Sequence, residues 1–416
     1  MIKKSKVTSV NLESLNNPQT ILMAQDKDQK TLNVPPLRFP GFTDEWKKTT
    51  LGEIGSGFNY GLNAPAKEFD GVNKYIRITD IDDSSGAYIE DDKVSPNGIL
   101  TQDYIVKDND ILLARTGAST GKSYLYNPND GKLYFAGFLI RFNVSSANPY
   151  FVYSILHTRN YWKWVSIMSA RSGQPGVNSQ EYSSYSLNIP SYEEQDRIAS
   201  LLRLLDERIA TQNKIIEDLK KLKSAIIDKL YSEVKGEIYM YSDIFTVVTE
   251  RNNKRLYNTV IAASQEFGMV ERESLNLKVQ FDEESINTYK IINSGDYVIH
   301  LRSFQGGFAF SRLQGICSPA YIILRPNERL EYSYFENYFT SSKFINSLRL
   351  VTYGIRDGRS INVEEWLSMK VTLPSKDEQK RIIQTIQSIQ DKIVNETNIL
   401  YKLDAEREYC LQAMFI

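Results

Sequence analysis

The segment Thr116–Ser123 is the part of the sequence that most resembles a nucleotide site. It reads Thr-Gly-Ala-Ser-Thr-Gly-Lys-Ser and differs from the phosphate loop G-x-x-x-x-G-K-[ST] at its first position, where Thr116 replaces a glycine. A phosphate loop must lead into a helix whose N-terminus faces the phosphates. The following residues 123–128, Ser-Tyr-Leu-Tyr-Asn-Pro, predict a short strand and a turn instead. We therefore expect no NTP site and no cofactor here.

Contact with a nucleic acid is a second interpretation of this loop. Arg115 precedes it, and the corresponding place in the C-terminal half reads Arg-Ser-Phe-Gln-Gly-Gly over residues 302–307. Arginine can pair with guanine through two hydrogen bonds, while Lys, Ser and Thr hold phosphates. A glycine-rich turn with a solvated arginine remains an equal alternative. The candidate DNA-binding residues in these loops are Arg115, Thr116, Ser119, Lys122, Arg302, Ser303 and Gln305.

A second pair of loops has similar chemistry. Residues 171–178 read Arg-Ser-Gly-Gln-Pro-Gly-Val-Asn, and residues 356–362 read Arg-Asp-Gly-Arg-Ser-Ile-Asn. Gln and Asn amides can pair with adenine through two hydrogen bonds. The two asparagines can instead cap a following helical turn, which is the slightly favoured interpretation for those two. The candidates from these loops are Arg171, Gln174, Asn178, Arg356, Arg359 and Asn362.

Residues for catalysis or metal binding are missing from the sequence. Two cysteines, Cys317 and Cys410, and two histidines, His157 and His300, are too few and too scattered for a disulfide framework or a zinc cluster. The sequence also lacks the Asp/Asn-Pro-Pro-Tyr quartet and the Phe-x-Gly-x-Gly loop of methyltransferases. We expect a non-catalytic protein that binds no metal.

The chain contains an internal duplication. Leu187–Ile198 recurs as Val371–Ile382, so that Pro190 corresponds to Pro374, 184 residues later. In each copy a stretch with short β-rich runs precedes a Pro-Ser pair, which is followed by a long helical pattern with acidic residues in its first turn. Ser191 and Ser375 are placed as the N-caps of these helices. The expected strands are 74–78, 110–114, 133–142, 258–263, 296–299 and 319–324.

Each predicted helix has apolar residues alternately four and three positions apart. Eight of ten such positions are apolar in each helix, which is typical of a coiled coil rather than of an ordinary surface helix. The alternative is that each helix packs on its own domain. The ten positions are 198, 202, 205, 209, 212, 216, 219, 223, 226 and 230 in the first helix, and the same numbers plus 184 in the second.

The polar residues within these positions predict how the two helices align. An antiparallel pair that sets Lys223 against Glu396 also sets Gln212 against Arg407 and opposes only apolar residues elsewhere. Because unpaired polar groups are costly to bury, we expect these four residues to fix the register.

Composition is that of a folded globular protein, with 41% hydrophobic and 24% charged residues among 416. The sequence has no apolar run long enough to cross a bilayer and no signal-peptide pattern at its start, so we expect a cytoplasmic location. The formal net charge of −1 means that any affinity for DNA must come from local patches or from partner subunits.

These features resemble one known family, the specificity subunits of type I restriction-modification systems (the HsdS family). The resemblance rests on the two Pro-Ser helix starts, on Glu-Gln-x-Arg-Ile at 194–198 and 378–382, and on Leu-Arg-Phe-Pro-Gly-Phe at 37–42 followed by Trp46. The second half lacks a copy of the last motif. The resemblance implies a subunit that recognises a split site in double-stranded DNA. It also implies two methyltransferase subunits, which flip an adenine and methylate N6, and restriction subunits that translocate and cleave DNA.

The expected fold is α+β, with two α/β target recognition domains joined by a long antiparallel two-helix coiled coil in a pseudo-two-fold repeat. A coiled-coil scaffold that does not touch DNA is the alternative function, which the neutral net charge keeps open. The expected segments are a polar N-terminal arm (1–36), a first recognition domain (37–188), a first helix (189–235), a second recognition domain (236–372) and a second helix (373–416).

Overall fold

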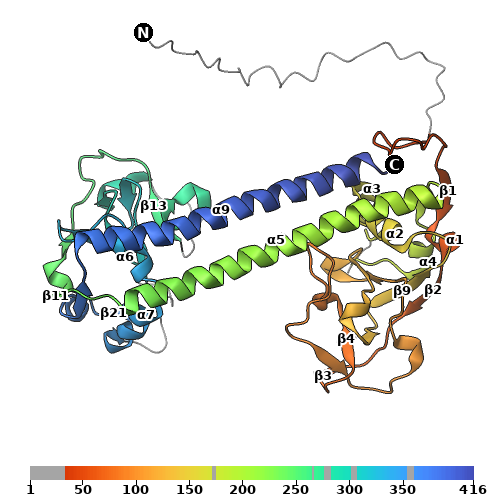
Figure 1. Cartoon of the computed structure of the whole chain (residues 1–416), viewed down its shortest axis with the longest axis horizontal. Coiled ribbons are helices and arrows are strands. Elements are labelled where there is room, and N and C mark those ends of the chain that lie inside the picture. Colours follow the sequence, from red (N-terminus) through yellow and green to blue (C-terminus); the bar gives the residue numbers. More distant parts are fainter. Residues whose placement is uncertain (1–32, 171–174, 265–266, 276–282, 301–306, 354–359) are drawn as a thin grey trace, which may run out of the picture. The chain divides into compact units, whose positions relative to one another are not determined.

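The structure is a computed structural model of the chain, and it describes residues 33–170, 175–264, 267–275, 283–300, 307–353 and 360–416 (Figure 1). The chain forms two compact units. Unit 1 comprises Met1–Glu207 and Ala405–Ile416, and unit 2 comprises Arg208–Asp404. Among the described residues, no helix has the length and apolar character needed to span a membrane.

Unit 1 is built around a four-stranded antiparallel sheet in the order β2-β9-β6-β7. These strands are β2 (Gly55–Tyr60), β9 (Leu139–Val144), β6 (Asp110–Ala114) and β7 (Ser123–Leu125). The smaller pairs are β1 (Lys47–Thr50) with β10 (Ser186–Ile189), β3 (Ala66–Glu68) with β5 (Val94–Pro96), and β4 (Lys74–Ile76) with β8 (Leu133–Phe135). The short helices are α1 (Leu51–Ile54), α2 (Pro149–Ile155), α3 (Arg159–Met168) and α4 (Ser179–Ser183).

Unit 2 contains a four-stranded antiparallel sheet with the same arrangement, in the order β12-β19-β16-β17. These strands are β12 (Phe245–Val248), β19 (Ile322–Pro326), β16 (Tyr297–Ile299) and β17 (Phe308–Phe310). The two-stranded pairs are β11 (Glu237–Met240) with β22 (Lys370–Leu373), β13 (Ile261–Ser264) with β14 (Gly268–Glu271), β15 (Lys290–Ile292) with β18 (Gly315–Cys317), and β20 (Thr352–Tyr353) with β21 (Ser360–Ile361). The short helices are α6 (Tyr334–Tyr338), α7 (Ser342–Ser347) and α8 (Val363–Leu367).

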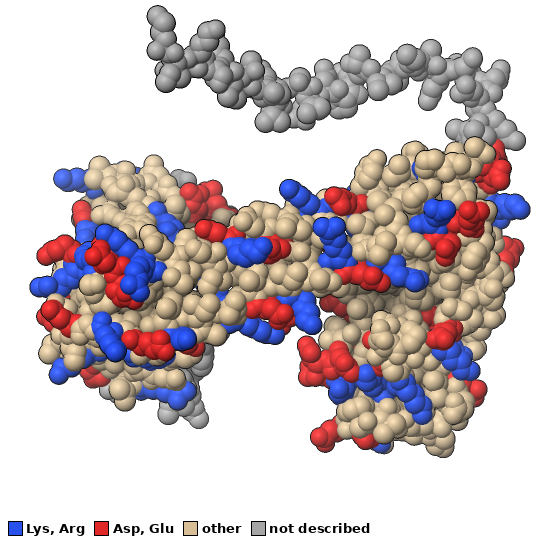
Figure 2. Space-filling view, viewed as in Figure 1, with Lys and Arg blue, Asp and Glu red and all other residues tan. Residues whose placement is uncertain are grey.

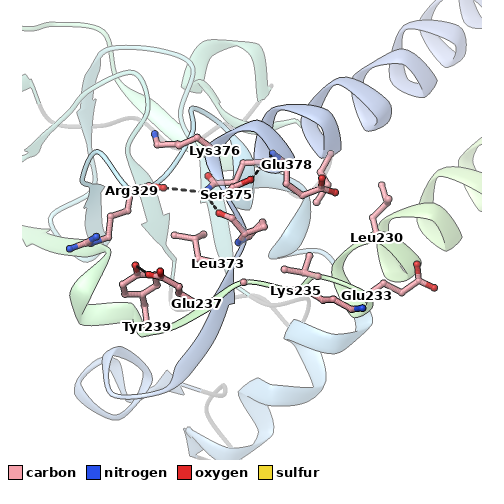
Figure 3. Close-up of a pocket in the computed structure, with 15 residues that line it drawn as sticks. Leu230, Glu233, Lys235, Glu237, Tyr239, Arg329, Leu373, Ser375, Lys376 and Glu378 are labelled. Atoms are coloured by element: carbon pink, nitrogen blue, oxygen red, sulfur yellow. Dashed lines mark hydrogen bonds between the residues drawn. The ribbon is translucent and has the colours of Figure 1, made fainter.

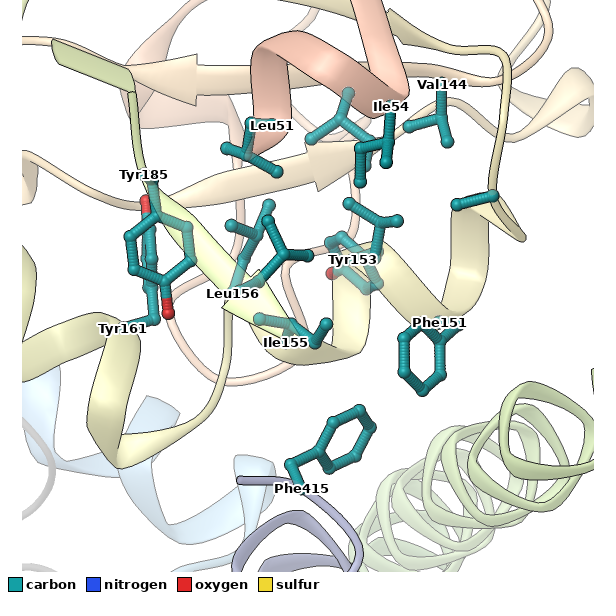
Figure 4. Close-up of a cluster of buried hydrophobic side chains, with 14 of the residues drawn as sticks. Leu51, Ile54, Val144, Phe151, Tyr153, Ile155, Leu156, Tyr161, Tyr185 and Phe415 are labelled. Atoms are coloured by element: carbon teal, nitrogen blue, oxygen red, sulfur yellow. The ribbon is translucent and has the colours of Figure 1, made fainter. Parts of the chain in front are cut away.

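The main core of unit 1 lies where the sheet meets α2, α3, residues 198–202 and the last residues of the chain, 411–415 (Figure 4). Phe151 of α2 packs against Phe415 at the end of the chain, with ring centroids 5.3 Å apart. In unit 2 the residues at the corresponding places, Tyr334 and Tyr231, have ring centroids 5.5 Å apart. Buried aromatic side chains thus join each sheet domain to the end of a long helix.

The two long helices are α5 (Tyr192–Ser232) and α9 (Lys376–Ala413). Each begins directly after the predicted capping serine, because the hydroxyl of Ser191 accepts the amide of Glu194 and Ser375 accepts that of Glu378, both at 3.4 Å. The expected helix starts are therefore confirmed. At both ends the helices are a few residues shorter than the segments 189–235 and 373–416.

A buried glutamine ties each long helix to its sheet domain. The side-chain amide of Gln195 donates to the carbonyl of Pro190 at 3.0 Å and accepts the amide of Asn148 at 2.9 Å. In unit 2, Gln379 donates to Pro374 at 3.0 Å and accepts the amide of Glu331 at 2.8 Å. Both glutamines are at most 2% exposed, so each closes a turn that water does not reach.

The predicted inner face of the helices is confirmed. All twenty positions of the four-and-three pattern are buried or half-buried, whereas most residues between them are exposed. Within unit 2, parts of α5 and α9 lie side by side (Figure 1). The sequence pattern therefore identified which face of each helix is inward.

The predicted pairing of Lys223 with Glu396 is wrong. Gln212 instead donates to the Glu396 carboxylate at 2.6 Å and to its backbone carbonyl at 3.0 Å, and the two residues are 184 positions apart. Lys223 donates to Gln390 at 2.8 Å.

Arg407, which was predicted to face Gln212, pairs with Asp206 within unit 1. Asp206 and Gln390 are themselves 184 residues apart, as are Lys223 and Arg407. The prediction failed because it paired opposite charges within the seam. Lysine and arginine have long side chains, and they reach sideways to residues next to the seam instead.

We expect Gln195→Ala and Gln379→Ala each to destabilise its own unit. Each change leaves a buried backbone amide and a proline carbonyl without partners, at a cost of about 1 to 3 kcal/mol. Chemical denaturation should show a lower midpoint, and hydrogen exchange should place the loss in the mutated unit. Gln387→Ala, an exposed glutamine on α9, is the matched control, and an equal loss in that variant would contradict the assignment.

We expect Gln212→Leu alone to lower the melting temperature, since it leaves the Glu396 carboxylate in the seam without its amide donor. Adding Glu396→Leu should restore the melting temperature, because two apolar groups then face each other. Hydrogen bonds from Lys392 and Gln212 lower the pKa of Glu396. The ionised Glu396 carboxylate therefore stabilises the folded state at pH values above its unfolded-state pKa. This stabilisation is lost as the pH falls through its lower folded-state pKa.

The pH dependence of melting provides the control for this pair. The wild-type chain should lose stability on acidification more steeply than the double leucine variant. A double variant no more stable than Gln212→Leu would show that the two side chains are not coupled.

Candidate nucleic-acid interface

Arg115 lies at the end of a fully buried strand. All five residues of β6 are buried, and Arg115 is the first residue beyond it. Its guanidinium lies over the ring of Tyr60, the last residue of β2, at 4.7 Å from the ring centroid. The stacking holds the guanidinium in place while its N–H groups stay available to a ligand.

The charge of Arg115 is not neutralised by a carboxylate within the described part of the chain. Tyr60 accepts a hydrogen bond from the amide of Ser179 at 3.4 Å. Hydrogen bonding by Ser179 lowers the pKa of Tyr60, and the positive charge of Arg115 acts in the same direction. The pair therefore presents a cation on an aromatic platform, which suits contact with a phosphate or a guanine edge.

A cavity of about 680 Å³ adjoins this pair. Phe138, in the loop between β8 and β9, lines it and is 61% exposed. Arg77 also lines it, but both its guanidinium and its amide bind the Asp80 carboxylate, so its charge is already satisfied. The other lining residues include Gly61, Leu62, Asn63, Ala64, Ala66, Tyr75, Ile78, Thr79, Ala136 and Gly137.

The loop that resembles a phosphate loop has a different structure. Residues 117–119 form one 3₁₀ turn, and the next element is strand β7 rather than a helix. Lys122 forms an ion pair with Asp83 at 2.6 Å, and its side chain is 13% exposed. The expectation of a strand after this loop is confirmed, and Lys122 is held in an ion pair instead of pointing freely to solvent.

The two predicted loops of unit 1 lie next to each other. Thr116 forms a β-bridge with Gly176, and the amide of Val177 donates to the carbonyl of Arg115 at 2.9 Å. A Cβ atom at position 176 would come within 3.1 Å of the same carbonyl, which is why a glycine suits this place. The hydroxyl of Tyr182 donates to Ala114 O at 2.7 Å. Backbone pairing and a buried tyrosine thus hold the loop base rigid.

Asn178 and Asn362 are used as helix caps. Asn178 accepts the amide of Glu181 at 2.9 Å at the start of α4, and Asn362 accepts that of Glu365 at 3.3 Å at the start of α8. Their side-chain oxygens are therefore engaged within the protein, as the capping interpretation expected. Contact of these two residues with DNA stays a prediction.

Of the remaining candidates, Thr116 and Ser119 lie in the 3₁₀ turn region and are half-buried. The other candidates lie outside the described residues, and their assignment stays a prediction. These are Arg171, Gln174, Arg302, Ser303, Gln305, Arg356 and Arg359.

Sequence reasoning missed Tyr60 and Phe138. Both are large apolar residues left exposed, at 42% and 61%. Tyr60 ends strand β2 and is followed by Gly61, and Phe138 follows Gly137 directly before strand β9. An aromatic residue next to a glycine at the end of a strand was the available signal. Their proximity to Arg115 depends on pairing between β2, β9 and β6, which are far apart in the sequence.

Basic and acidic side chains are mixed over the face shown in Figure 2, in keeping with the net charge of −1. Within the described ranges, no group of three or more His, Cys, Asp or Glu residues is arranged to hold a metal ion. The loops next to Arg115 are the candidate contact region.

Comparison with known proteins agrees with this organisation. Residues 43–221 match the family described as type I restriction modification DNA specificity domain. The chain is 23% identical over 412 residues to the MjaVIII specificity subunit of a type I restriction enzyme from Methanocaldococcus jannaschii, covering 90% of this chain and 92% of that protein.

Two solved structures have a similar fold. One is the S subunit of a type I restriction-modification system from M. genitalium (TM-score 0.54, 14% identity, 92% and 99% of the two chains). The other is a chain from a type I R-M system studied for its complex assembly and conformational transition (TM-score 0.55, 17% identity, 91% and 98%). Residues 43–221 therefore match a type I restriction modification DNA specificity domain, and the chain as a whole is similar in sequence and fold to specificity subunits of type I restriction-modification systems.

Proposed function

We propose that this chain selects a bipartite site in double-stranded DNA and directs partner methyltransferase and restriction subunits to it. The observation that carries the proposal is the repeated sheet, β2-β9-β6-β7 in unit 1 and β12-β19-β16-β17 in unit 2. Two copies of one scaffold on one chain can each present a reading loop. The recognition domains are residues 37–188 and 236–372.

The long helices act as an antiparallel coiled coil between these domains. The polar pairs support this role, because Gln212 bonds to the residue 184 positions later and the partners of Lys223 and Arg407 differ by the same offset. Such a pattern is expected of two repeats related by a pseudo-two-fold axis. In this role Gln212, Glu396, Lys223 and Arg407 keep the helices in register.

The chain contributes recognition, and its partners contribute the chemistry. Two methyltransferase subunits would flip an adenine and methylate N6 with S-adenosylmethionine, and restriction subunits would translocate and cleave DNA. This chain itself is non-catalytic and holds no cofactor. Its near-neutral charge suits a subunit that supplies only part of the positive surface of a larger complex.

The alternative is a scaffold that does not contact DNA. The ion pair of Lys122 with Asp83 and the mixed surface charge favour it. A DNA-binding measurement with the assembled methyltransferase complex separates the two functions. If the chain is only a scaffold, a substitution in the loop at Arg115 would leave the DNA affinity of the complex unchanged.

We expect Arg115→Ala to weaken DNA binding by about 1 to 3 kcal/mol and to relax recognition of one half-site only. Methylation mapping with the assembled complex measures both effects. Arg159→Ala is the matched control, since Arg159 is a 75% exposed arginine of the same unit that pairs with Glu408. Equal changes in both half-sites would contradict the division of recognition between domains.

We also expect helix length to set the gap between half-sites. One heptad inserted into both α5 and α9 adds about 10.5 Å at 1.5 Å per residue. The preferred gap should then grow by about three base pairs, given about 34 Å per DNA turn of 10 to 10.5 base pairs. Methylated-site sequencing reads out the gap, and an unchanged gap in an active complex would rule out this spacer role.

A further inference from the structure

Unit 2 contains a cavity of about 840 Å³ beside the start of α9 and the end of α5 (Figure 3). Its apolar wall includes Leu230, Val234, Leu373 and Ile382, and Glu378 lies at its polar side. The remaining lining residues are Glu233, Lys235, Gly236, Glu237, Tyr239, Arg329, Pro374, Ser375, Lys376 and Gln379.

In unit 1 the corresponding place is filled by the chain itself. Residues 33–46, here called the entry segment, precede β1 and contact the start of α5 and the end of α9. Arg38 forms two hydrogen bonds with Glu194, at 2.7 and 2.6 Å, and Glu194 is the residue 184 positions before Glu378. The amide of Leu37 donates to the carbonyl of Ala413 at 2.9 Å. Ala413 corresponds to Lys229, the neighbour of Leu230.

The entry segment also fills the apolar part of its site. Phe39 packs against the core cluster that includes Ile198 and Met414, which correspond to Ile382 and Leu230 of the cavity. Trp46, the residue before β1, is 3% exposed, with its ring 5.7 Å from that of Phe151. The residue before β11 is Gly236, which has no side chain to place there.

The reason for the difference lies in the connections. In unit 2 only residues 233–236 link α5 to β11, so within the described residues β11 is not preceded by a segment equivalent to residues 33–46. The Glu194 side chain is consequently 1% exposed beneath Arg38, whereas the Glu378 side chain is 38% exposed. Glu378 contacts Arg381 at 3.3 Å, an i,i+3 surface pair whose arginine is 75% exposed. Such pairs are weak and are easily replaced by a better partner.

Two of the basic residues around the cavity are already engaged. Lys376 pairs with Glu331 at 3.1 Å, and the guanidinium of Arg329 lies over the ring of Tyr239 at 5.0 Å. The carboxylate of Glu378 beside an apolar wall therefore favours a ligand that carries a cation next to a large apolar group.

We propose that the cavity of unit 2 binds, in trans, a segment of a partner protein with an arginine followed by an aromatic residue, as Arg38 and Phe39 bind in unit 1. Residues 1–32 of this chain contain no arginine and no aromatic residue, so they lack this chemistry. The entry segment of a second copy is itself engaged in its own unit 1. A different protein is thus the occupant that the observations favour.

A fluorescein-labelled peptide with the sequence of residues 34–42, Val-Pro-Pro-Leu-Arg-Phe-Pro-Gly-Phe, is the probe. Fluorescence anisotropy with the full chain should show saturable one-to-one binding. Glu378→Gln in the chain, or alanine for arginine in the peptide, should weaken it about tenfold or more, as expected for loss of a charge-assisted hydrogen bond. No saturable binding would overturn the proposal.

Glu194→Gln is the matched control and should leave peptide affinity unchanged. If Glu194→Gln abolished binding while Glu378→Gln did not, the peptide would be displacing the entry segment and the proposal would fail. A charge exchange guards against misfolding, because Glu378→Arg should bind a peptide with glutamate in place of arginine.

Two further outcomes would assign the cavity to other occupants and overturn the proposal. One is displacement of the probe by a peptide of residues 1–32. The other is concentration-dependent dimerisation of the chain that the probe abolishes, measured by light scattering.

Discussion

One buried glutamine at the start of each long helix joins that helix to its own sheet domain through hydrogen bonds. Gln195 and Gln379 each join a proline carbonyl to a backbone amide of the sheet domain, so the helix leaves the domain in one direction. A rigid helix start matters because a small angular error there grows along a helix of 41 or 38 residues. The glutamine is effective because both of its partners are backbone groups, which remain in place when surface side chains move.

The helix seam illustrates how polar residues specify one arrangement. A seam of apolar residues alone tolerates shifts by a heptad, since apolar contacts have little directional preference. The buried amide of Gln212 removes that freedom, because it satisfies both a carboxylate oxygen and a backbone carbonyl of Glu396. Lys223 and Arg407 find partners beside the seam, in Gln390 and Asp206. In unit 2 the described polar contacts of Gln212 and Lys223 across the seam are hydrogen bonds, and Lys223 does not face the opposite charge of Glu396.

The two halves differ where the chain enters each sheet domain. Unit 1 receives a segment whose Arg38 covers Glu194, while in unit 2 the chain passes directly from α5 into β11. Both copies retain the glutamate, the proline and the apolar residues next to them, but among the described residues an arginine of the same chain covers the glutamate in unit 1 alone. Because the two units are repeats, the contacts of Arg38 and Phe39 in unit 1 indicate which kind of ligand the cavity of unit 2 could bind.

The sequence by itself determined the duplication, the helix starts, the inner faces of both helices and strand β6. These follow from local patterns: a capping serine, a four-and-three spacing, and a buried apolar run between turn residues. It did not determine that residues 133–142 form two strands, that Gln212 pairs with Glu396, or that Tyr60 supports Arg115. Those features were decided by the tertiary structure, because each depends on which distant backbone atoms come within hydrogen-bond or van der Waals distance. Spacing along the chain carries no direct record of that distance.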